Sequence, residues 1–552
     1  MKKKTFYFAG IIACIISITL VSSCLKDYDL KKLAGVEWNP DLAAPLAYSS
    51  LTIRDILAKT DKNGNFSIDA QNFVTLVYKG NLLSLKAEDF LVFPNQNTSN
   101  SFTLSAAEQA ALLLGTVTVP FSQVISFNTG SNTKVDSLLL KGGKFLFSLT
   151  SDFQHSGSIT LTIPTAIKNG NPLTMTIPVI YSGSIVNISD SVDLTGYDIN
   201  MTTASPAYNQ IPVNISLTMT NSGAPVTPSS SLSFVCSLNN IKFHKLFGSI
   251  DQQVLSPDAD TVNVDIFNNS LGGGTFTLVE PKFIVTISNA YGVQIFANFQ
   301  KFQGYNSNRN PSTIDILGSG IPNPLPIPSP NISQLGQSIL SSFTLDKNNS
   351  NIVNAINFAP PYVIYQLSSG TIPPVAPNTN FVLDTSYFKV DMEIELPLYG
   401  TGFGFTVQDT LENVTFELTD QVESFLLRTF ISNGFPCEVK VQVYFADSLF
   451  NRLDSLMTSL DPSQQIIMAA AEVDGNSRVT GPPKEKTTDV LLTLDRVKHL
   501  KSMKYLLIKG EGMSTNNAGH NGPNVKIYSD YLLSVKMGAQ AKLKVIAPLS
   551  KK

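Results

Sequence analysis

The sequence is poor in charged residues, histidine, cysteine and tryptophan, and these shortages exclude several classes of protein. Charged side chains make up 15% of the 552 residues, and the chain has four histidines, four cysteines and one tryptophan. A surface with so little charge must be built mainly from Ser, Thr, Asn and Gln, as in many strand-rich exported proteins. The net charge is −3, and no Lys/Arg cluster is interleaved with aromatic residues. Nucleic acid is therefore not an expected partner.

The few histidines and cysteines do not form a metal-binding pattern. His155, His244, His499 and His520 contain no HxH or HExxH pair. Cys236 and Cys437 are far apart and lack metal-ligand spacing. Two unpaired buried thiols are favoured over one long-range disulfide, which stays open as the alternative. The sequence predicts neither a metal site nor a cofactor.

No catalytic motif is present either. Gly318-Ser319-Gly320 lacks the spacing of a nucleophile elbow, and Gly400-Thr401-Gly402-Phe403-Gly404 reads as a strand rather than a dinucleotide fingerprint. Glu393 and Glu395 share one strand face, where exposed charges that prevent aggregation are the simpler interpretation. We predict no catalytic residue, and a non-enzymatic protein is favoured over an enzyme.

One acidic segment has some resemblance to a calcium loop. Asp61, Asn63, Asn65, Ser67 and Asp69 alternate, but the glycine is misplaced and Asn72 stands where a calcium loop needs glutamate. The Asn63-Gly64 step is also a strong hairpin signal. A hairpin at Asp61–Asn65 is favoured over calcium, and Leu271–Thr275 is predicted to be a second hairpin turn.

The N-terminus has the order of an export signal. Met1–Thr5 is basic, and the apolar run Phe6–Leu20 is shorter than the roughly 20 residues of a transmembrane helix. Val21-Ser22-Ser23-Cys24 resembles the bacterial lipoprotein box, which implies cleavage before Cys24 and acylation of its thiol. Two or more acyl chains would hold the protein on a bilayer.

The residues after Cys24 bear on which side of the membrane the protein faces. Leu25-Lys26-Asp27-Tyr28-Asp29 resembles the signal that carries lipoproteins to the cell surface in Bacteroidota. This implies display on the outer membrane, facing the exterior in preference to the periplasm.

The hydrophobic pattern of the remaining chain is mainly that of β-strands. Apolar and polar residues alternate with period two in several segments, which indicates antiparallel sheets with one face on a core. These segments are Ile159–Ile163, Leu173–Val179, Val213–Met219, Phe283–Ile287, Phe388–Leu396 and Val439–Phe445. We predict a mainly β, multidomain fold of antiparallel β-sandwiches with a few short helices. Val439–Phe445 is the expected neighbour of Phe388–Leu396.

Helices are predicted at a few places only. Ser105 with Glu108 forms a capping box for a helix that continues from Ala106 to Leu114 and is stopped by Gly115. Weaker helical patterns are Leu51–Ala58, Ile332–Leu340, Ile352–Phe358 and Asp495–Met503. The turn at Asn289-Ala290-Tyr291-Gly292 is similar to Asn221-Ser222-Gly223, which does not by itself establish a repeat.

The chain length suggests about three domains. Closely spaced prolines between Gly320 and Pro330 disfavour helix and strand and predict a stiff linker. The expected divisions are a signal peptide (1–23), the acylated cysteine with its tether (24–45), a β-rich domain (46–195), a β-sandwich domain (196–319), the linker (320–330) and a β-sandwich domain with short helices (331–552).

A short triplet occurs more often than composition explains. Asp-Ser/Thr-apolar appears at Asp136-Ser137, Asp190-Ser191, Asp260-Thr261, Asp409-Thr410, Asp447-Ser448 and Asp454-Ser455. It resembles the acceptor of O-glycosylation in exported Bacteroidota proteins, which implies Ser137, Ser191, Thr261, Thr410, Ser448 and Ser455 as sites. The alternative is that Asp and Ser simply suit the places where strands begin. Both interpretations stay open.

Taken over most of its length, the sequence resembles a large set of Bacteroidota outer-membrane surface lipoproteins. The segments that carry this likeness are Trp38-Asn39-Pro40-Asp41, Leu76-Val77-Tyr78-Lys79-Gly80, Leu396-Pro397-Leu398-Tyr399-Gly400 and Gly434-Phe435-Pro436. The resemblance implies a shared fold and compartment but transfers no active site. The expected function is a lipid-anchored, non-enzymatic binding or scaffold subunit, with an outer-membrane barrel complex for assembly, secretion or uptake as its candidate partner. The alternative is a glycan-binding or glycan-cleaving surface protein.

Overall fold

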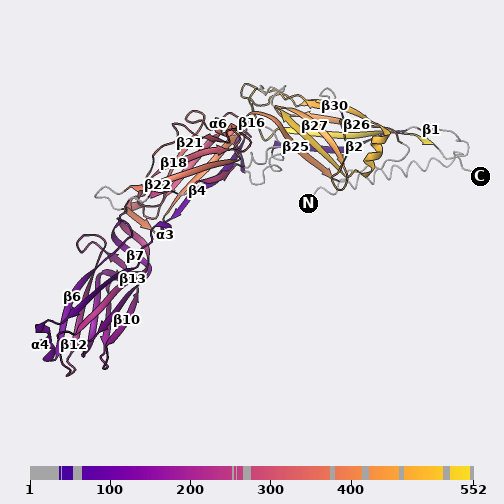
Figure 1. The fold of residues 1–552 in the computed structure, drawn as a ribbon. Helices are drawn as coiled ribbons and strands as arrows, with labels where there is room; N and C mark the ends of the chain where they lie inside the picture. The colour runs from indigo at the N-terminus through magenta and orange to yellow at the C-terminus, as the bar shows by residue number, and fades with distance from the viewer. Residues whose placement is uncertain are drawn as a thin grey trace, which may run out of the picture. The chain divides into compact units, whose positions relative to one another are not determined.

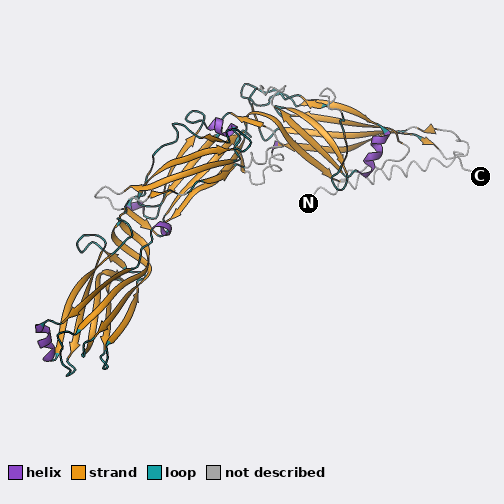
Figure 2. Cartoon of the chain, viewed as in Figure 1, coloured by secondary structure: helices purple, strands orange, loops and turns teal. Residues whose placement is uncertain are grey.

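The computed structural model describes residues 37–38, 40–53, 65–251, 254–256, 258–264, 275–372, 380–412, 422–458, 465–513 and 523–546. Strands dominate these residues and all pairings between them are antiparallel, so the predicted mainly β fold is confirmed (Figures 1 and 2). None of the helices in the described part of the chain is long and apolar enough to cross a membrane.

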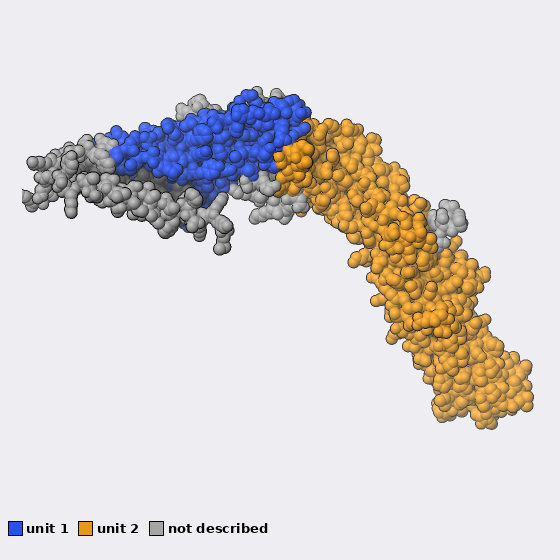
Figure 3. All heavy atoms as spheres, turned by 180° about the vertical axis from the view of Figure 1, so that it is seen from behind, with its two compact units in different colours: residues 1–60, 270–275, 400–552 blue, residues 61–269, 276–399 orange. Residues whose placement is uncertain are grey.

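The chain divides into two compact units (Figure 3). Unit 1 comprises residues 1–60, 270–275 and 400–552, and unit 2 comprises residues 61–269 and 276–399. Unit 1 contains one β-sandwich, called sandwich I. Unit 2 contains two, called sandwich II and sandwich III.

Sandwich III is continuous in sequence and consists of two four-stranded layers. One layer has the order β5-β13-β7-β10, formed by Gln96–Thr103, Ser231–Ser249, Lys134–Ser151 and Val186–Asp193. The other has the order β6-β12-β8-β9, formed by Thr116–Ser126, Gln210–Thr220, Ser156–Lys168 and Asn171–Val179. The short strand β11 (Asp198–Asn200) pairs with both β7 and β8 and so links the layers.

Sandwich II has the same strand order but is interrupted in sequence. Its first layer, β4-β24-β17-β21, is formed by Val74–Lys86, Tyr387–Pro397, Lys282–Asn289 and Ile339–Leu345, and β3 (Asn65–Ile68) pairs with the outer side of β4. Its second layer places β15 (Asp260–Asn263) beside β22 (Tyr362–Ile372), and β22 beside β18 (Gln294–Tyr305). The short strands β19 (Thr313–Asp315) and β20 (Leu325–Ile327) follow β18, and β14 (Val254–Leu255) also pairs with β22.

Sandwich I repeats this arrangement once more. Its first layer, β2-β33-β26-β30, is formed by Asp41–Thr52, Leu532–Leu543, Val422–Asn433 and Lys484–Leu492. Its second layer contains β25 (Tyr399–Glu412), β31 (Tyr505–Met513) and β27 (Glu438–Ala446), followed by β28 (Arg452–Ser455) and β29 (Ile466–Met468).

The three sandwiches therefore share one topology. Each sandwich has eight strand positions, which can be numbered in chain order; β19 and β20 share position 5 of sandwich II, β28 and β29 share position 5 of sandwich I, and the linking strand β11 is not counted. In every sandwich, one layer then has the order 1-8-3-6 and the other the order 2-7-4-5. This is the double Greek-key order of the jelly roll. Sandwich III is inserted between positions 1 and 2 of sandwich II, and both are inserted between positions 1 and 2 of sandwich I. The protein is a set of three nested jelly rolls.

A corner between positions 3 and 4 is repeated in all three sandwiches. Asn289 and Asn433 are fully buried, and each accepts a hydrogen bond from the backbone N–H two residues later, on Tyr291 and Phe435. In sandwich III, Ser151 takes the same place and accepts from the N–H of Phe153. The turn at Asn289 is thus structurally equivalent to the turn at Asn433. It is not equivalent to the turn at Asn221, which lies after position 7 of sandwich III.

The helices whose bounds lie within the described residues are short and connect strands. They are α3 (Ala87–Phe90), α4 (Ala106–Leu113), α6 (Ile352–Asn357) and α7 (Leu494–His499), with 3-10 turns at Ile332–Gln334 and Leu500–Ser502. The predicted capping box of α4 is confirmed, since Ser105 Oγ accepts from the Glu108 N–H and Glu108 accepts from the Ser105 N–H. The remaining short strands are β1 (Glu37–Trp38), paired with β34 (Val545–Ile546), and β16 (Thr275–Leu278), β23 (Asn380–Leu383) and β32 (Val525–Lys526).

Two of the local predictions were wrong, and the start of a third needs correction. For the helix predicted at Leu51–Ala58, Leu51 and Thr52 belong instead to strand β2, because Leu51 is buried opposite Leu533 of β33. Ile53 is helical, and residues 54–58 lie outside the described residues. The pattern Ile332–Leu340 forms only one 3-10 turn before strand β21 begins at Ile339. Strand β24 pairs with β17 and β4, whereas β27, its predicted neighbour, belongs to another sandwich.

The predicted linker needs correction in part, whereas the two predicted hairpin turns are not tested. The β3–β4 hairpin turns at Asp69–Asn72, where the Asp69 carboxylate accepts from the N–H groups of Gln71 and Phe73. Residues 61–64 and 271–274 lie outside the described residues. Within 320–330, the prolines do not prevent a strand: Leu325–Ile327 pairs with one side of β18, and an edge position tolerates Pro326. This segment and residues 195–196 both lie inside unit 2. The predicted division into separately folding domains stays a prediction.

Candidate functional site

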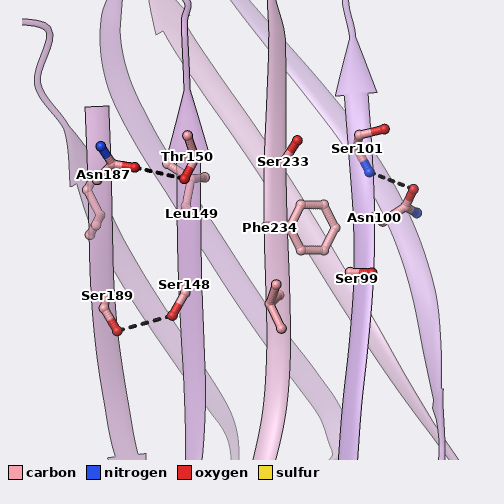
Figure 4. A pocket seen from close by; sticks show the side chains of 12 residues that line it. Ser99, Asn100, Ser101, Ser148, Leu149, Thr150, Asn187, Ser189, Ser233 and Phe234 are labelled. Atoms are coloured by element: carbon pink, nitrogen blue, oxygen red, sulfur yellow. Dashed lines mark hydrogen bonds between the residues drawn. The ribbon is translucent and has the colours of Figure 1, made fainter. Parts of the chain in front are cut away.

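A broad hollow lies on the outward face of sandwich III, across β5, β13, β7 and β10 (Figure 4). It has a volume of about 770 Å³ and is shallow. We call it the serine hollow. It is lined by Ser99, Asn100, Ser101, Ser148, Leu149, Thr150, Asn187, Ile188, Ser189, Ser233, Phe234 and Val235.

The hollow arises from the strand register. Ser99 and Ser101 lie opposite Val235 and Ser233, and Ser148 and Thr150 lie opposite Ser189 and Asn187. These side chains alternate with Phe147, Leu149, Phe234 and Cys236, which are buried in the core. Because hydroxyl side chains are short, the outward face of the sheet is not filled to the height that longer residues would reach.

Hydrogen bonds hold one side of the hollow in place. The Ser148 and Ser189 hydroxyl oxygens are 3.2 Å apart, and Thr150 Oγ1 donates to Asn187 Oδ1 over 2.8 Å. On the other side, Asn100 Oδ1 accepts from the Ser101 N–H over 2.8 Å. Within the described residues, the side-chain hydroxyls of Ser99 and Ser233 make no hydrogen bond. They remain available to a partner.

The lining contains no carboxylate, amine, imidazole or thiol. The hollow can therefore offer hydrogen bonds from hydroxyl and amide groups above apolar side chains. It has no group that transfers protons near neutral pH and no charged group that would pair with a charged ligand. Uncharged polar groups also cost less free energy to desolvate than ions do. The arrangement suits the binding of an uncharged surface.

The corresponding layers of sandwiches I and II serve as internal comparisons, and both carry charge. In sandwich II, Glu393 and Glu395 form ion pairs with Lys79 and Lys282 at 3.1 and 3.4 Å. Sandwich I has a hollow of about 470 Å³ on the same layer, but Arg428 and Lys536 line it, and Arg428 pairs with Asp489. The lining of the serine hollow differs from that of the sandwich I hollow in having no charged side chain. Outside the hollow, the same layer of sandwich III does carry charge: Lys141 pairs with Asp384 at 3.0 Å, and Lys144 lies opposite Asp193.

Glu393 and Glu395 were predicted to be exposed strand charges rather than an acid–base pair. Their ion pairs on the outward face of β24 agree with that interpretation. Across the described residues, no group of three or more His, Cys, Asp or Glu side chains could hold a metal ion.

The two body cysteines are unpaired and buried, as predicted. Burial raises the pKa of both the Cys236 and Cys437 thiols to about 12. Cys236 Sγ lies 3.3 Å from Gln123 Nε2 inside sandwich III. Neither thiol is poised for nucleophilic chemistry.

The histidines do not gather into a site in the described part of the chain. His155 is buried beside Ser222, with its Nδ1 3.1 Å from Ser222 Oγ, and burial lowers its pKa. The Ser222 hydroxyl donates to the Gln154 carbonyl instead, and no carboxylate is bonded to His155 in the described residues. His244 contacts Asp384 at 3.0 Å, and His520 lies outside the described residues. His155 and Ser222 therefore do not form a serine–histidine nucleophile.

The six predicted O-glycosylation acceptors differ in exposure. Ser191, Thr261 and Ser448 are exposed, Ser137 and Thr410 are half-buried, and Ser455 is buried. Burial would prevent a transferase from reaching Ser455 in the folded chain. Cys24, the predicted lipidation site, lies outside the described residues.

The structure gives the Asp-Ser/Thr triplet a role that sequence reasoning missed. In four of the triplets the Asp carboxylate accepts from the N–H of the next residue; these are Asp190–Ser191 (2.7 Å), Asp260–Thr261 (2.7 Å), Asp409–Thr410 (3.0 Å) and Asp454–Ser455 (2.7 Å). Three of them lie on β10, β15 and β28, each of which pairs on one side only among the described residues. An acidic cap on a free amide makes an edge strand a poor template for another strand.

Comparisons with known proteins leave the family open. The sequence matches no protein family, and no curated protein is significantly similar to it. A protein from Parabacteroides distasonis, provisionally described as secreted, is similar over 54% of this chain and 89% of its own, at 10% identity and a TM-score of 0.28. A structure of infectious bursal disease virus (Gx strain) covers 89% of this chain and 86% of its own, at 8% identity and a TM-score of 0.14. At these TM-scores neither likeness carries an argument about function.

Proposed function

We propose that this protein is an exported, lipid-anchored protein of the bacterial outer membrane that acts as a non-enzymatic binding or scaffold subunit. The serine hollow of sandwich III is the observation that carries the binding role. It is broad and its lining is uncharged, whereas Arg428 and Lys536 line the hollow on the same layer of sandwich I. A partner with a neutral polar surface could lie on it without leaving a charge unpaired.

The anchor is proposed on sequence grounds. The segment that ends at Cys24 resembles a lipoprotein box, and acyl chains on that cysteine would fix the body to the membrane. The acidic residues that follow favour display on the cell surface. Protease treatment of intact cells tests this point: release of the body supports surface display, and full protection until the outer membrane is broken contradicts it.

A protein partner is favoured over a glycan. Glycan-binding clefts commonly use exposed aromatic faces, and glycan cleavage needs paired carboxylates. Among the residues that line the serine hollow, the one aromatic is Phe234, which is 1% exposed, and none is a carboxylate. A barrel complex for assembly, secretion or uptake is therefore the proposed partner class, and a glycan-binding surface protein remains the alternative.

Affinity purification from outer membranes in mild detergent tests the proposal. We expect stoichiometric recovery of an outer-membrane protein, identified by mass spectrometry. If the protein elutes alone and removes a polysaccharide from solution, the scaffold role is wrong and the glycan role takes its place.

A further inference from the structure

The edge strand β5 differs from the other open edges of sandwich III. The four edge strands of this sandwich are β5, β10, β6 and β9. Natural sheets protect such edges with charges or prolines, because unpaired N–H and C=O groups attract further strands. Strand β10 carries Asp190 and Asp193, β6 carries Pro120, and β9 carries Pro172 and Pro178. Strand β5, with the sequence QNTSNSFT, has neither kind of protection.

The equivalent strands of the other two sandwiches are protected. In sandwich II, β4 is covered on its outer side by β3 over four residue pairs. In sandwich I, β2 contains Asp41 and Pro45, and its register shifts between Pro45 and Ala47. The open edge is thus not a requirement of the topology. It is particular to β5.

The backbone groups on this edge alternate along the strand. The Ser101 N–H donates to Asn100 Oδ1. On β13, the carbonyl of Ser231 accepts from the Asp152 N–H at the end of β7, so Ser231 and its opposite residue Thr103 do not bond to each other, and Thr103 directs its backbone groups away from β13. In an antiparallel pair such residues alternate with those bonded to the partner strand. The outward groups are therefore those of Asn97, Ser99, Ser101 and Thr103. All four residues are exposed.

These four residues are arranged symmetrically about Asn100. If two copies of β5 pair antiparallel with Asn100 at the centre, Ser99 lies opposite Ser101 and Asn97 lies opposite Thr103. Every such pair brings together two residues whose backbone groups point outward. The facing side chains are uncharged and can bond to each other, so no like-charge repulsion opposes the contact. A two-fold axis requires a self-complementary surface of this kind.

We propose that two copies of this chain associate through β5 and so join their β5-β13-β7-β10 layers into one continuous sheet. The two serine hollows then lie side by side on one face, and the binding surface doubles. The inference does not depend on the anchor or on the partner proposed above.

The substitution Asn100→Asp tests the proposal with little change of shape. It places on β5 the same acidic cap that Asp190 provides on β10, which would hold the Ser101 N–H and set two carboxylates against each other at the two-fold axis. The matched control is Asp190→Asn, which removes the acidic cap from the opposite edge of the same layer.

Sedimentation velocity of the full chain, with Cys24→Ser to prevent acylation, measures the result. We expect a dimer at micromolar concentration for the unsubstituted body and for Asp190→Asn, and at least a tenfold weaker dimer for Asn100→Asp. Backbone amides of Asn97, Ser99, Ser101 and Thr103 should exchange more slowly with deuterium as the concentration rises. A monomer up to about 100 μM, an unchanged dimer in Asn100→Asp, or a dimer whose β5 amides exchange as in the monomer overturns the proposal.

Discussion

The repeated corner between positions 3 and 4 gives a graded prediction of stability. Asn433 Nδ2 donates to the carbonyls of Cys437 and Ala469 at 2.9 and 2.8 Å, and its Oδ1 accepts from the Phe435 N–H at 3.1 Å. Asn289 makes the matching set with Val293, Pro328 and Tyr291 at 3.1, 3.0 and 3.0 Å. Each side chain therefore serves three buried or half-buried backbone groups.

The expected cost follows from the number of bonds lost. Each hydrogen bond contributes about 1 kcal/mol net, and a buried partner left unsatisfied adds to the loss. Asn433→Ala and Asn289→Ala should each lower the free energy of unfolding by about 3 kcal/mol. Ser151→Ala removes only the bond from the Phe153 N–H and should cost about 1 kcal/mol.

Hydrogen exchange in increasing denaturant, read by mass spectrometry, resolves which part of the chain is affected. Asn433→Ala should destabilise peptides of unit 1, and Asn289→Ala peptides of unit 2. Asn214→Ala, at an exposed position, is the control and should change stability by less than about 0.5 kcal/mol. If the two asparagine substitutions cost no more than Ser151→Ala, the corner does not hold the sandwiches as described.

Three further predictions use other parts of the chain. In Gly292→Ala the new Cβ would lie 2.2 Å from the Phe381 ring, so chemical denaturation should show a free energy of unfolding lower by about 2–3 kcal/mol. In the control Gly475→Ala the new Cβ has no atom within 4 Å, so stability should not change. Equal effects of the two substitutions would refute the packing argument. Because burial raises the pKa of the Cys236 and Cys437 thiols to about 12, iodoacetamide at pH 8 should label them only after unfolding, and rapid labelling of the native chain would contradict this. If the native protein is O-glycosylated, site mapping should find sugar on Ser191, Thr261 or Ser448 but none on Ser455; sugar on Ser455 alone would count against the exposure argument.

Local features of the fold could be predicted from the sequence because they depend on neighbouring residues. The alternation in Leu173–Val179 correctly assigns which side chains of β9 are buried, and Ser105 with Glu108 correctly places the start of α4. The hairpin predicted from the Asn-Gly step at residues 63–64 lies outside the described residues and stays a prediction.

The topology could not be predicted, because the insertions separate strands that pair. Strand β2 pairs with β33 near the other end of the chain, and β4 pairs with β24. Proximity in sequence therefore suggested the wrong partner for Phe388–Leu396. The repeat was equally hidden, because its shared corner keeps only a buried polar residue and an aromatic residue two positions later, as in Ser151 and Phe153.

The serine hollow was also beyond sequence reasoning. Serines such as Ser99, Ser148 and Ser233 are unremarkable one by one, and they share a face only through the pairing of β5, β13 and β7. The low overall charge pointed to neutral polar faces in general. Only the strand register shows that the side chains gathered around this hollow are all uncharged.

The proposed binding role is tested most directly by placing charge and bulk in the serine hollow. Ser233→Arg puts a guanidinium on the exposed middle of the hollow, and Asn214→Arg puts the same group on the exposed outward face of the other layer of sandwich III. Purification from outer membranes in mild detergent then measures how much partner each variant retains. The account predicts that Ser233→Arg loses at least nine-tenths of the partner, while Asn214→Arg keeps it. Equal retention by the two variants would contradict the central claim.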